Sequence, residues 1–445
     1  MLEEQLKKQI SIEQELNQVA YKGISFGETI GFFNKKYPEF KIKNPFKKRT
    51  FMQWLSVLTK LRFQKFSATK TDVLFIHYSQ RQKDWGILDG VEEQMKEGIG
   101  IKRYFATAFV QQYSLKDLFS WARFWIVHGK RTNRELKMIL EKHNINKETI
   151  CFLINYLITS SLYLEACTRK LKKLNPSIIL FTYDRDKFSS IVTASANSLG
   201  IKTTTIIHGS CFHTPLEYIP FISKEILIWG SLHIDHLTKF GVNLKQMHIV
   251  GFPGFKKDNG KRAVLKKRFG IGENKKVVLF AANLDNYFES ELKAFMEETK
   301  NINSWTGVVK LHPTLFSKPL PLVLQNPEET VVLPEECTAY ESVILADVVV
   351  GLTSTLLMEA LSADRPVIIY NPCKNPRKGI GEFLLEFGFV SEAISNGELK
   401  KILESSNHFQ DPFNLEKQKI FFQKICSFQD HDSEKEIIEF LMKNL

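Results

Sequence analysis

The sequence has no pair of cysteines at CxxC spacing and no apolar run long enough to cross a bilayer. Its six cysteines are scattered through 445 residues, which argues against a disulfide framework and against a structural zinc site. The longest weakly charged run, residues 151–164, is short and rich in Asn, Ser and Thr, so we expect a buried helix there. The polar N-terminus lacks the apolar segment of a signal peptide, and these features together predict a cytoplasmic protein.

Acidic residues are absent from residues 41–70, which contain nine Lys or Arg side chains. The formal net charge of the whole chain is +12, so the remaining 415 residues carry only +3. Aromatic side chains are interleaved with these basic ones, a composition that suits the anionic inner face of a plasma membrane. A solvated helix covering the first domain explains the segment equally well, and both interpretations stay open. Nucleic acid is not an expected partner, because no nucleic-acid-binding motif accompanies the charge.

Short apolar runs rich in β-branched residues alternate with helical periodicity in two successive blocks of the chain. This alternation predicts an α/β protein with two Rossmann-like domains that face each other across a cleft, the GT-B arrangement, preceded by a helical extension. Residues 79–173 are expected to be mostly helical. A glycine- and proline-rich cluster near residue 251 marks the boundary between the blocks. The predicted units are residues 1–70 (basic helical extension), 71–250 (acceptor domain), 251–395 (nucleotide-sugar donor domain) and 396–445 (helices packing back).

The clearest strand–helix–strand unit is residues 348–370. An apolar run ends at Gly351, a helix follows, and a second apolar run begins at Val367. Backbone N–H groups at a helix start, with the positive end of the helix dipole, favour phosphate binding. An ordinary capped helix gives the same local pattern, so the interpretation depends on the other strand ends. The polar residues of this unit are Thr353, Ser354, Thr355 and Glu359.

Polar residues also follow three other predicted strands, at the carboxyl ends where ligands of open α/β sheets bind. Asp184 and Asp186 follow one strand, and His208 follows the next. In the second block, Lys310 ends a strand, and His312 and Pro313 come directly after it.

These residues support a coherent chemistry. His312, aimed by the turn at Pro313, can donate to a phosphate oxygen that Lys310, Ser354 and Thr355 also approach. Glu359 can accept hydrogen bonds from ribose hydroxyls. His208, with an unperturbed pKa near 6.5, suits general-base work on a hydroxyl, and Asp184 or Asp186 could orient it or act as the base. Close approach of a substrate to the backbone is expected at Gly209, Ser210 and Gly251. No metal site is apparent, so we expect no metal and no cofactor.

The order of these motifs resembles the GT-B glycosyltransferases of bacterial surface glycans. The motifs are HGS at 208–210, GFPG at 251–254, KLHP at 310–313 and GLTST at 351–355. More narrowly, they are similar to the group that joins CDP-glycerol glycerophosphotransferases, CMP-Kdo and polysialic-acid capsule transferases, and UDP-GlcNAc 2-epimerases. The resemblance covers roughly residues 175–390. It implies that His208 and His312 lie across the interdomain cleft, and that the donor contacts include Ser354, Thr355 and Glu359.

The resemblance implies an inverting, metal-independent transferase. Its donor would be nucleotide-activated, CMP- or CDP-linked, and its acceptor a hydroxyl of a cell-surface polysaccharide or lipid-linked glycan. GLTST departs from the TDYSS-like string of the glycerophosphotransferases, with Gly351 in the place of an Asp, which argues against glycerol phosphate. The lone Asp89-Gly90 only approaches the acidic pair of sialyl and Kdo enzymes. Two alternatives remain: a UDP-sugar 2-epimerase, using Asp184, Asp186 or Asp285 at the sugar ring, and a non-catalytic nucleotide-sugar-binding protein.

Overall fold

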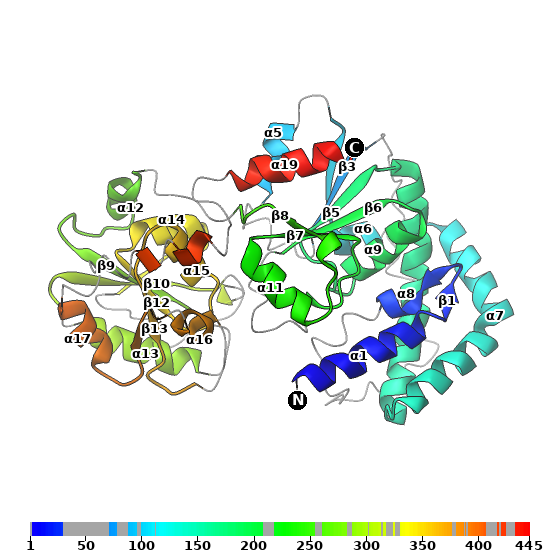
Figure 1. The fold of residues 1–445 in the computed structure, drawn as a ribbon, viewed down its shortest axis with the longest axis horizontal. Helices are drawn as coiled ribbons and strands as arrows, with labels where there is room; N and C mark the ends of the chain where they lie inside the picture. The colour runs from blue at the N-terminus through cyan, green and yellow to red at the C-terminus, as the bar shows by residue number, and fades with distance from the viewer. Residues whose placement is uncertain are drawn as a thin grey trace.

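Two six-stranded parallel sheets form the framework of the protein (Figure 1). This confirms the predicted α/β class and the two Rossmann-like sheets. The computed structural model describes residues 2–29, 71–77, 88–95, 99–111, 113–207, 218–253, 260–282, 287–300, 302–312, 315–316, 324, 330–375, 380–386, 388, 390–405, 416–417, 420–423 and 432–445.

The first sheet has the strand order β4-β3-β5-β6-β7-β8, and all of its neighbouring strands are parallel. Its central strands are buried on both faces, which explains their continuous apolar sequence. The order reverses between β3 and β5, where open α/β sheets place ligands. The strands are β3 (Val73–His77), β4 (Ile101–Phe105), β5 (Ile178–Phe181), β6 (Lys202–Ile206), β7 (Glu225–Ile228) and β8 (Met247–Ile249).

The second sheet has the order β11-β10-β9-β12-β13-β14, again parallel throughout. This is the order of dinucleotide-binding folds, and it reverses between β9 and β12. The strands are β9 (Lys276–Ala281), β10 (Trp305–Lys310), β11 (Val331–Val332), β12 (Val348–Gly351), β13 (Val367–Tyr370) and β14 (Ser391–Ala393).

Helices cover both sheets. Those that follow strands of the first sheet or connect them are α5 (Asp89–Met95), α6 (Ala106–Val110), α7 (Leu115–Lys142), α8 (Lys147–Leu174), α9 (Ser189–Ser198) and α11 (Ser231–Lys239). Those of the second are α12 (Arg262–Arg268), α13 (Phe288–Thr299), α14 (Ala339–Leu345), α15 (Leu356–Ser362), α16 (Ile380–Leu385) and α17 (Glu398–Glu404).

Helix α8 is, within the described ranges, the one helix long and apolar enough to cross a membrane. About half of its apolar stretch is buried (56%), and Leu157, Leu164 and Leu171 belong to the hydrophobic core on one face of the first sheet. Composition alone therefore gives only weak evidence for a span. The packing is that of a core helix, as the sequence predicted for residues 151–164.

The N-terminal segment comprises α1 (Leu2–Leu16), β1 (Ala20–Tyr21), β2 (Ile24–Ser25) and α2 (Phe26–Thr29). Ile12, Leu16 and Phe26 are buried in one hydrophobic cluster with residues of β3 and β5. This part of the predicted extension thus completes the core of the first sheet. The basic stretch 41–70 lies outside the described residues.

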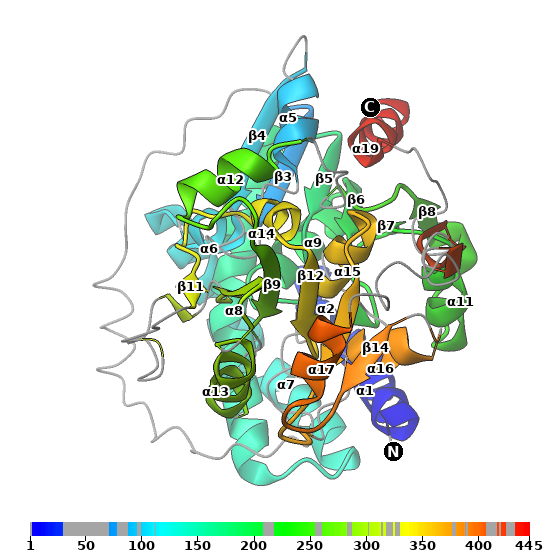
Figure 2. The same cartoon turned by 90° about the vertical axis from the view of Figure 1, so that its left-hand side faces the viewer.

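The final helix, α19 (Ser433–Lys443), lies beside α5, which precedes β4 of the first sheet (Figures 1 and 2). Gln94 donates to Glu434 over 3.1 Å, and the rings of His248 and Phe440 have centroids 4.8 Å apart. The chain therefore returns to its first sheet after completing the second.

Candidate active site

The carboxyl ends of three strands meet where the order of the second sheet reverses. Lys310 of β10 pairs in register with Ala281 of β9. On the other side of β9, an ideal Cβ placed on Gly351 of β12 would lie 3.1 Å from the carbonyl oxygen of Ala281. Only a residue as small as glycine fits this approach comfortably. The sheet register therefore brings together the KLHP and GLTST segments that the sequence singled out.

The hydroxyl residues follow β12 directly and lead into α15. The Ser354 hydroxyl accepts a hydrogen bond from the Leu356 N–H over 3.3 Å. Thr355 occupies the N-cap position, yet its side chain makes no capping hydrogen bond. Because α15 has only seven residues, its dipole is weak, and phosphate binding here depends on the hydroxyls and on the neighbouring strand end.

Glu359 lies one turn into α15. Its side chain is half-buried, and its carboxyl has no hydrogen-bond or ion-pair partner among the described residues. Burial raises the pKa of this carboxyl to about 8. A partly buried carboxyl without a partner among the described residues can accept hydrogen bonds from hydroxyl groups of a ligand, and its contact with a ribose stays a prediction.

Lys310 makes a contact that the sequence could not reveal. Its side chain is 9% exposed, its Nζ donates to the carbonyl oxygen of Cys337, and burial lowers the pKa of its ammonium. The half-buried His312 follows two residues later, and its carbonyl accepts from the Leu315 N–H over 2.8 Å. A protein carbonyl thus engages Lys310, and His312 is the better candidate donor to a phosphate. Pro313 lies outside the described residues.

Asp184 is almost completely buried after β5, with 1% of its surface exposed. Its Oδ2 accepts hydrogen bonds from the N–H groups of Ile222 and Ser223, over 2.8 and 2.7 Å. Burial raises the pKa of the carboxyl against the effect of these bonds. Asp184 therefore links the end of β5 to the segment that leads into β7 by hydrogen bonds, which gives it a structural role.

Asp186 is the more accessible of the two carboxylates. Its Oδ1 accepts from the Phe188 N–H over 2.9 Å and its Oδ2 from the Ser189 N–H over 3.2 Å, which caps the start of α9. Burial raises the pKa of this carboxyl to about 6. A pKa near 6 suits a general base at neutral pH.

The remaining predicted residues of the first sheet are only partly described. His208, Gly209 and Ser210 lie outside the described residues. Gly251 has a φ of +74°, and an ideal Cβ on it would lie 2.3 Å from the Ser433 hydroxyl of α19. The close approach observed at Gly251 is therefore that of the C-terminal helix.

Sequence reasoning missed His77, the last residue of β3, where the order of the first sheet reverses. It is 4% exposed, and neither ring nitrogen has a hydrogen-bond partner in the described part of the chain. Burial lowers the pKa of the imidazole to about 4, which keeps the ring neutral. The signal available in the sequence was its position, since His77 directly follows the apolar run at residues 73–76.

No group of three or more His, Cys, Asp or Glu side chains among the described residues is arranged to hold a metal ion. Metal independence stays a prediction.

Comparisons with known proteins concern the sequence of residues 235–443 and the fold of the chain. Residues 235–443 match the family model described as CDP-Glycerol:Poly(glycerophosphate) glycerophosphotransferase. The matched segment contains the whole second sheet and α19. No curated protein sequence matches the chain.

Solved structures share the fold at low sequence identity. A UDP-GlcNAc 2-epimerase from Neisseria meningitidis bound to UDP-GlcNAc has a TM-score of 0.52 and 13% identity, over 84% of this chain and 100% of that chain. A structure of the wall teichoic acid polymerase TagF soaked with CDPG has a TM-score of 0.51 and 10% sequence identity, over 85% of this chain and 89% of that chain. The S. aureus MnaA–UDP structure has a TM-score of 0.51 and 12% sequence identity, over 84% of this chain and 98% of that chain.

At such identities these likenesses establish the fold alone, whereas the family match concerns the sequence of residues 235–443. Both agree with the resemblance inferred from the motifs. The chain therefore has the GT-B fold and is a transferase of the glycosyl- or glycerophosphate-transferring kind, whose residues 235–443 are similar to the CDP-glycerol glycerophosphotransferase family.

Proposed function

We propose that this enzyme transfers a sugar or sugar-like unit, glycerol phosphate included, from a CMP- or CDP-linked donor to a hydroxyl of a cell-surface polymer or lipid-linked glycan. The observation that carries the proposal is Glu359, a partly buried carboxyl that has no partner in the described part of the chain and lies after the strand end where the second sheet reverses its order. This position lies inside the segment that matches the glycerophosphotransferase family.

The proposed donor site follows from the sheet register. The donor phosphates lie against the ends of β10 and β12, near His312, Ser354 and Thr355, and the ribose hydroxyls donate to Glu359. Lys310 donates one hydrogen bond to the Cys337 carbonyl, and its two other N–H groups could reach a phosphate at the same strand end.

Transfer needs one bond to form and one to break. The acceptor oxygen bonds to the transferred group, through the anomeric carbon of a sugar or the β-phosphorus of a CDP-alcohol. The bond from that atom to the leaving phosphate oxygen breaks, and the nucleotide departs with the electron pair. The acceptor proton passes to a base, for which His208, Asp186 and Asp184 are the candidates. The nucleotide-activated donor is a substrate, so this scheme requires neither a cofactor nor a metal.

Glycerol phosphate belongs among the candidate groups despite Gly351. The GLTST segment lacks the Asp of the TDYSS-like string, yet the segment that contains it matches the glycerophosphotransferase family. The structure also explains the glycine at position 351, because a Cβ there would lie only 3.1 Å from the carbonyl oxygen of Ala281. The difference between GLTST and the TDYSS-like string therefore does not exclude glycerol phosphate as the transferred group.

An epimerase is the second candidate, because the Neisseria meningitidis enzyme shares the fold. The family match favours transfer. A non-catalytic nucleotide-sugar-binding protein is the third candidate, and the experiment must distinguish it from the transferase and the epimerase.

The test is thermal unfolding of the full chain with CMP, CDP, UDP and GDP, since only a nucleotide that binds the folded state raises the Tm. Cytidine nucleotides should raise it, and Glu359→Gln should reduce the shift. Glu392→Gln, an exposed carboxylate on β14, is the matched control. Exclusive stabilisation by UDP, with exchange of the C2 proton of UDP-GlcNAc into solvent, would assign the chain to epimerisation. Binding of cytidine nucleotides without turnover on any polyol or glycan acceptor would favour the idle protein.

A further inference from the structure

His77 is a buried polar side chain whose burial no contact among the described residues explains. It ends β3 and is 4% exposed, and neither ring nitrogen has a hydrogen-bond partner in the part of the chain that the structure describes. Burial of a polar atom without a partner costs stability, so buried polar groups are nearly always paired. A bound molecule that forms a hydrogen bond with the imidazole would offset this cost.

The ring lies at the edge of the first sheet where ligands of parallel sheets bind. The order of this sheet reverses between β3 and β5, and His77 ends β3 on one side of the reversal. On the other side, the Thr182 N–H donates to the Ile76 carbonyl over 3.3 Å, which keeps the end of β5 beside the end of β3. Asp186 follows four residues later. Neighbouring strands are about 4.8 Å apart, so His77 and the segment that carries Asp186 line the same part of the edge.

The face of the sheet that carries His77 also carries a group of ion pairs. Phe105 of β4 pairs in register with His77, so Arg103, two residues earlier, lies on the same face. The guanidinium of Arg103 contacts Asp89 over 2.7 Å and also contacts Glu92, both on α5. Two carboxylates against one guanidinium leave an excess of negative charge near the ring.

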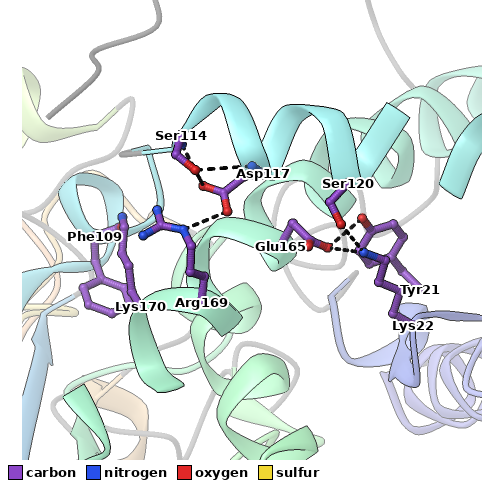
Figure 3. Close-up of polar contacts among 9 residues, drawn as sticks. All are labelled: Tyr21, Lys22, Phe109, Ser114, Asp117, Ser120, Glu165, Arg169 and Lys170. Atoms are coloured by element: carbon purple, nitrogen blue, oxygen red, sulfur yellow. Dashed lines mark hydrogen bonds and ion pairs between the residues drawn. The ribbon is translucent and has the colours of Figure 1, made fainter. Parts of the chain in front are cut away.

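The strand end next to His77 is fixed on the helices behind it. The rings of His77 and Phe105 meet edge to face, with centroids 6.1 Å apart. Helix α6 follows Phe105 directly, and the buried Lys170 of α8 donates to the carbonyl oxygen of Phe109 near the end of α6 (Figure 3). The ring of His77 therefore lies in a packed region, and its lack of a partner is not the result of a loose strand end.

We propose that His77 binds a hydroxyl group of an uncharged polyol or sugar unit of the acceptor. The inference rests on the proposed function, because it names a contact of the acceptor in the proposed transfer. The reacting hydroxyl lies at the end of β5, near the candidate bases, and His77 holds another hydroxyl of the same unit. His77 is thus an acceptor-binding residue that fixes the orientation of the unit, and it is not the base.

The chemistry of the ring favours a hydroxyl over a phosphate. Burial lowers the pKa of His77 to about 4, so the ring is neutral and presents one N–H donor and one acceptor nitrogen. A hydroxyl can bond with either nitrogen, whereas a phosphate oxygen can only accept. The small exposed fraction of the side chain admits a small group, and the carboxylates of Asp89 and Glu92 repel an anion.

The test separates the donor site from the acceptor site. Nucleotide release by the full chain is measured from CDP-glycerol and from CMP-sialic acid, in water alone and with glycerol, ribitol or methyl N-acetylglucosaminide as neutral acceptor probes. Release in water reports on the donor site, and the increase that a probe causes reports on the acceptor site. His77→Phe should leave release in water unchanged and lower the probe-dependent kcat/KM about tenfold, the equivalent of one hydrogen bond. His77→Gln retains a donor and an acceptor and should recover part of this loss.

A stability measurement distinguishes acceptor binding from a structural role. If no protein group bonds to the imidazole, His77→Phe or the smaller His77→Leu should have a Tm equal to or above that of the parent, because an apolar side chain replaces an unpartnered buried ring. A Tm that falls in both variants would show a structural bond and overturn the inference. The matched control is His128→Leu, the same change at an exposed histidine of α7, which should leave the Tm and both rates unchanged.

The kinetic outcomes separate this inference from the proposed function. Equal probe-dependent rates in His77→Phe and in the parent would overturn the inference, and so would a parent that no neutral probe accelerates. Glycerol 3-phosphate is the anionic counterpart of glycerol, and a preference for it that His77→Phe abolishes would assign the ring to a phosphate instead. If the parent released no nucleotide from either donor under any condition, the proposed transfer itself would fail, and the acceptor site with it.

Discussion

Glu13 of α1 and Arg185, which follows β5, form a buried ion pair with an Oε1–Nη2 distance of 2.9 Å. Arg185 is 1% exposed and Glu13 is 7% exposed. The guanidinium of Arg185 also donates to the carbonyl oxygen of Pro220, just before β7. The first helix of the chain therefore supports the strand end that carries Asp184 and Asp186.

Glu13→Ala should cost about 3 to 5 kcal/mol in the free energy of unfolding, because it removes the carboxylate that is paired with the buried guanidinium of Arg185. Urea unfolding of the full chain measures the loss. Gln14→Ala, an exposed truncation on the same helix, should change it by less than about 0.5 kcal/mol. The double variant Glu13→Leu/Arg185→Met should lose less than the two single changes summed, since no unpaired charge remains. Equal urea midpoints for Glu13→Ala and Gln14→Ala would contradict the role of the pair.

The strand–helix–strand unit of the second sheet could be predicted from the sequence. The predicted unit at residues 348–370, with one apolar run ending at Gly351 and a second beginning at Val367, agrees with β12, α15 and β13. Strands buried on both faces need a continuous apolar run, so the local sequence carries the whole signal.

Strand β4 was not predicted, because residues 79–173 were expected to be mostly helical. It is an edge strand, and all five of its residues are only partly buried. Half-exposed edge strands need no continuous apolar run, and IKRYF contains two basic residues. The local sequence therefore resembles that of a surface helix.

The site could be predicted as a set of strand ends, but the contacts within it could not. Lys310 donates to Cys337, which is 27 residues away in the chain, and Arg185 donates to Glu13, which is 172 residues away. Such partners follow from the order of the strands, which local spacing does not contain.

Glu359→Gln should become more stable relative to the parent protein as the pH rises. Burial raises the pKa of Glu359 from 4.5 to about 8, so between these values the folded protein retains a proton that the unfolded chain has released. The carboxyl therefore lowers stability progressively from about pH 4.5 to pH 8, and the amide does not. A tenfold change in proton affinity corresponds to about 1.4 kcal/mol, and with the partial exposure of the side chain we expect a difference on the order of 2 kcal/mol at pH 8. Urea unfolding at pH 5 and pH 8 checks this, and a constant difference would contradict the raised pKa.

Asp184→Ala and Asp186→Ala should separate structural support from catalysis. Asp184→Ala leaves the N–H groups of Ile222 and Ser223 without their acceptor, at a cost of about 2 to 4 kcal/mol. Asp186→Ala removes a helix cap, at a cost of about 1 kcal/mol. If Asp186 is the base, its variant should nevertheless lose about 10²- to 10⁴-fold in turnover. In the parent enzyme kcat/KM should then rise with pH through about 6, the raised pKa of Asp186. A turnover independent of pH between about 5 and 7 would exclude Asp186 as the base.

His312→Ala and His208→Ala should differ in which kinetic quantity they change. If His312 holds the donor phosphate, its loss should weaken nucleotide binding and slow transfer together, because the contact exists in both the ground and the transition state. If His208 is the base, its replacement should leave nucleotide affinity nearly intact while turnover falls about 10²- to 10⁴-fold. Calorimetric titration with the nucleotide and single-turnover kinetics separate the two effects. Normal turnover in His208→Ala, with turnover lost in Asp186→Ala, would make the carboxylate the base. Normal turnover in all three variants with the natural substrates would place the reaction away from these strand ends.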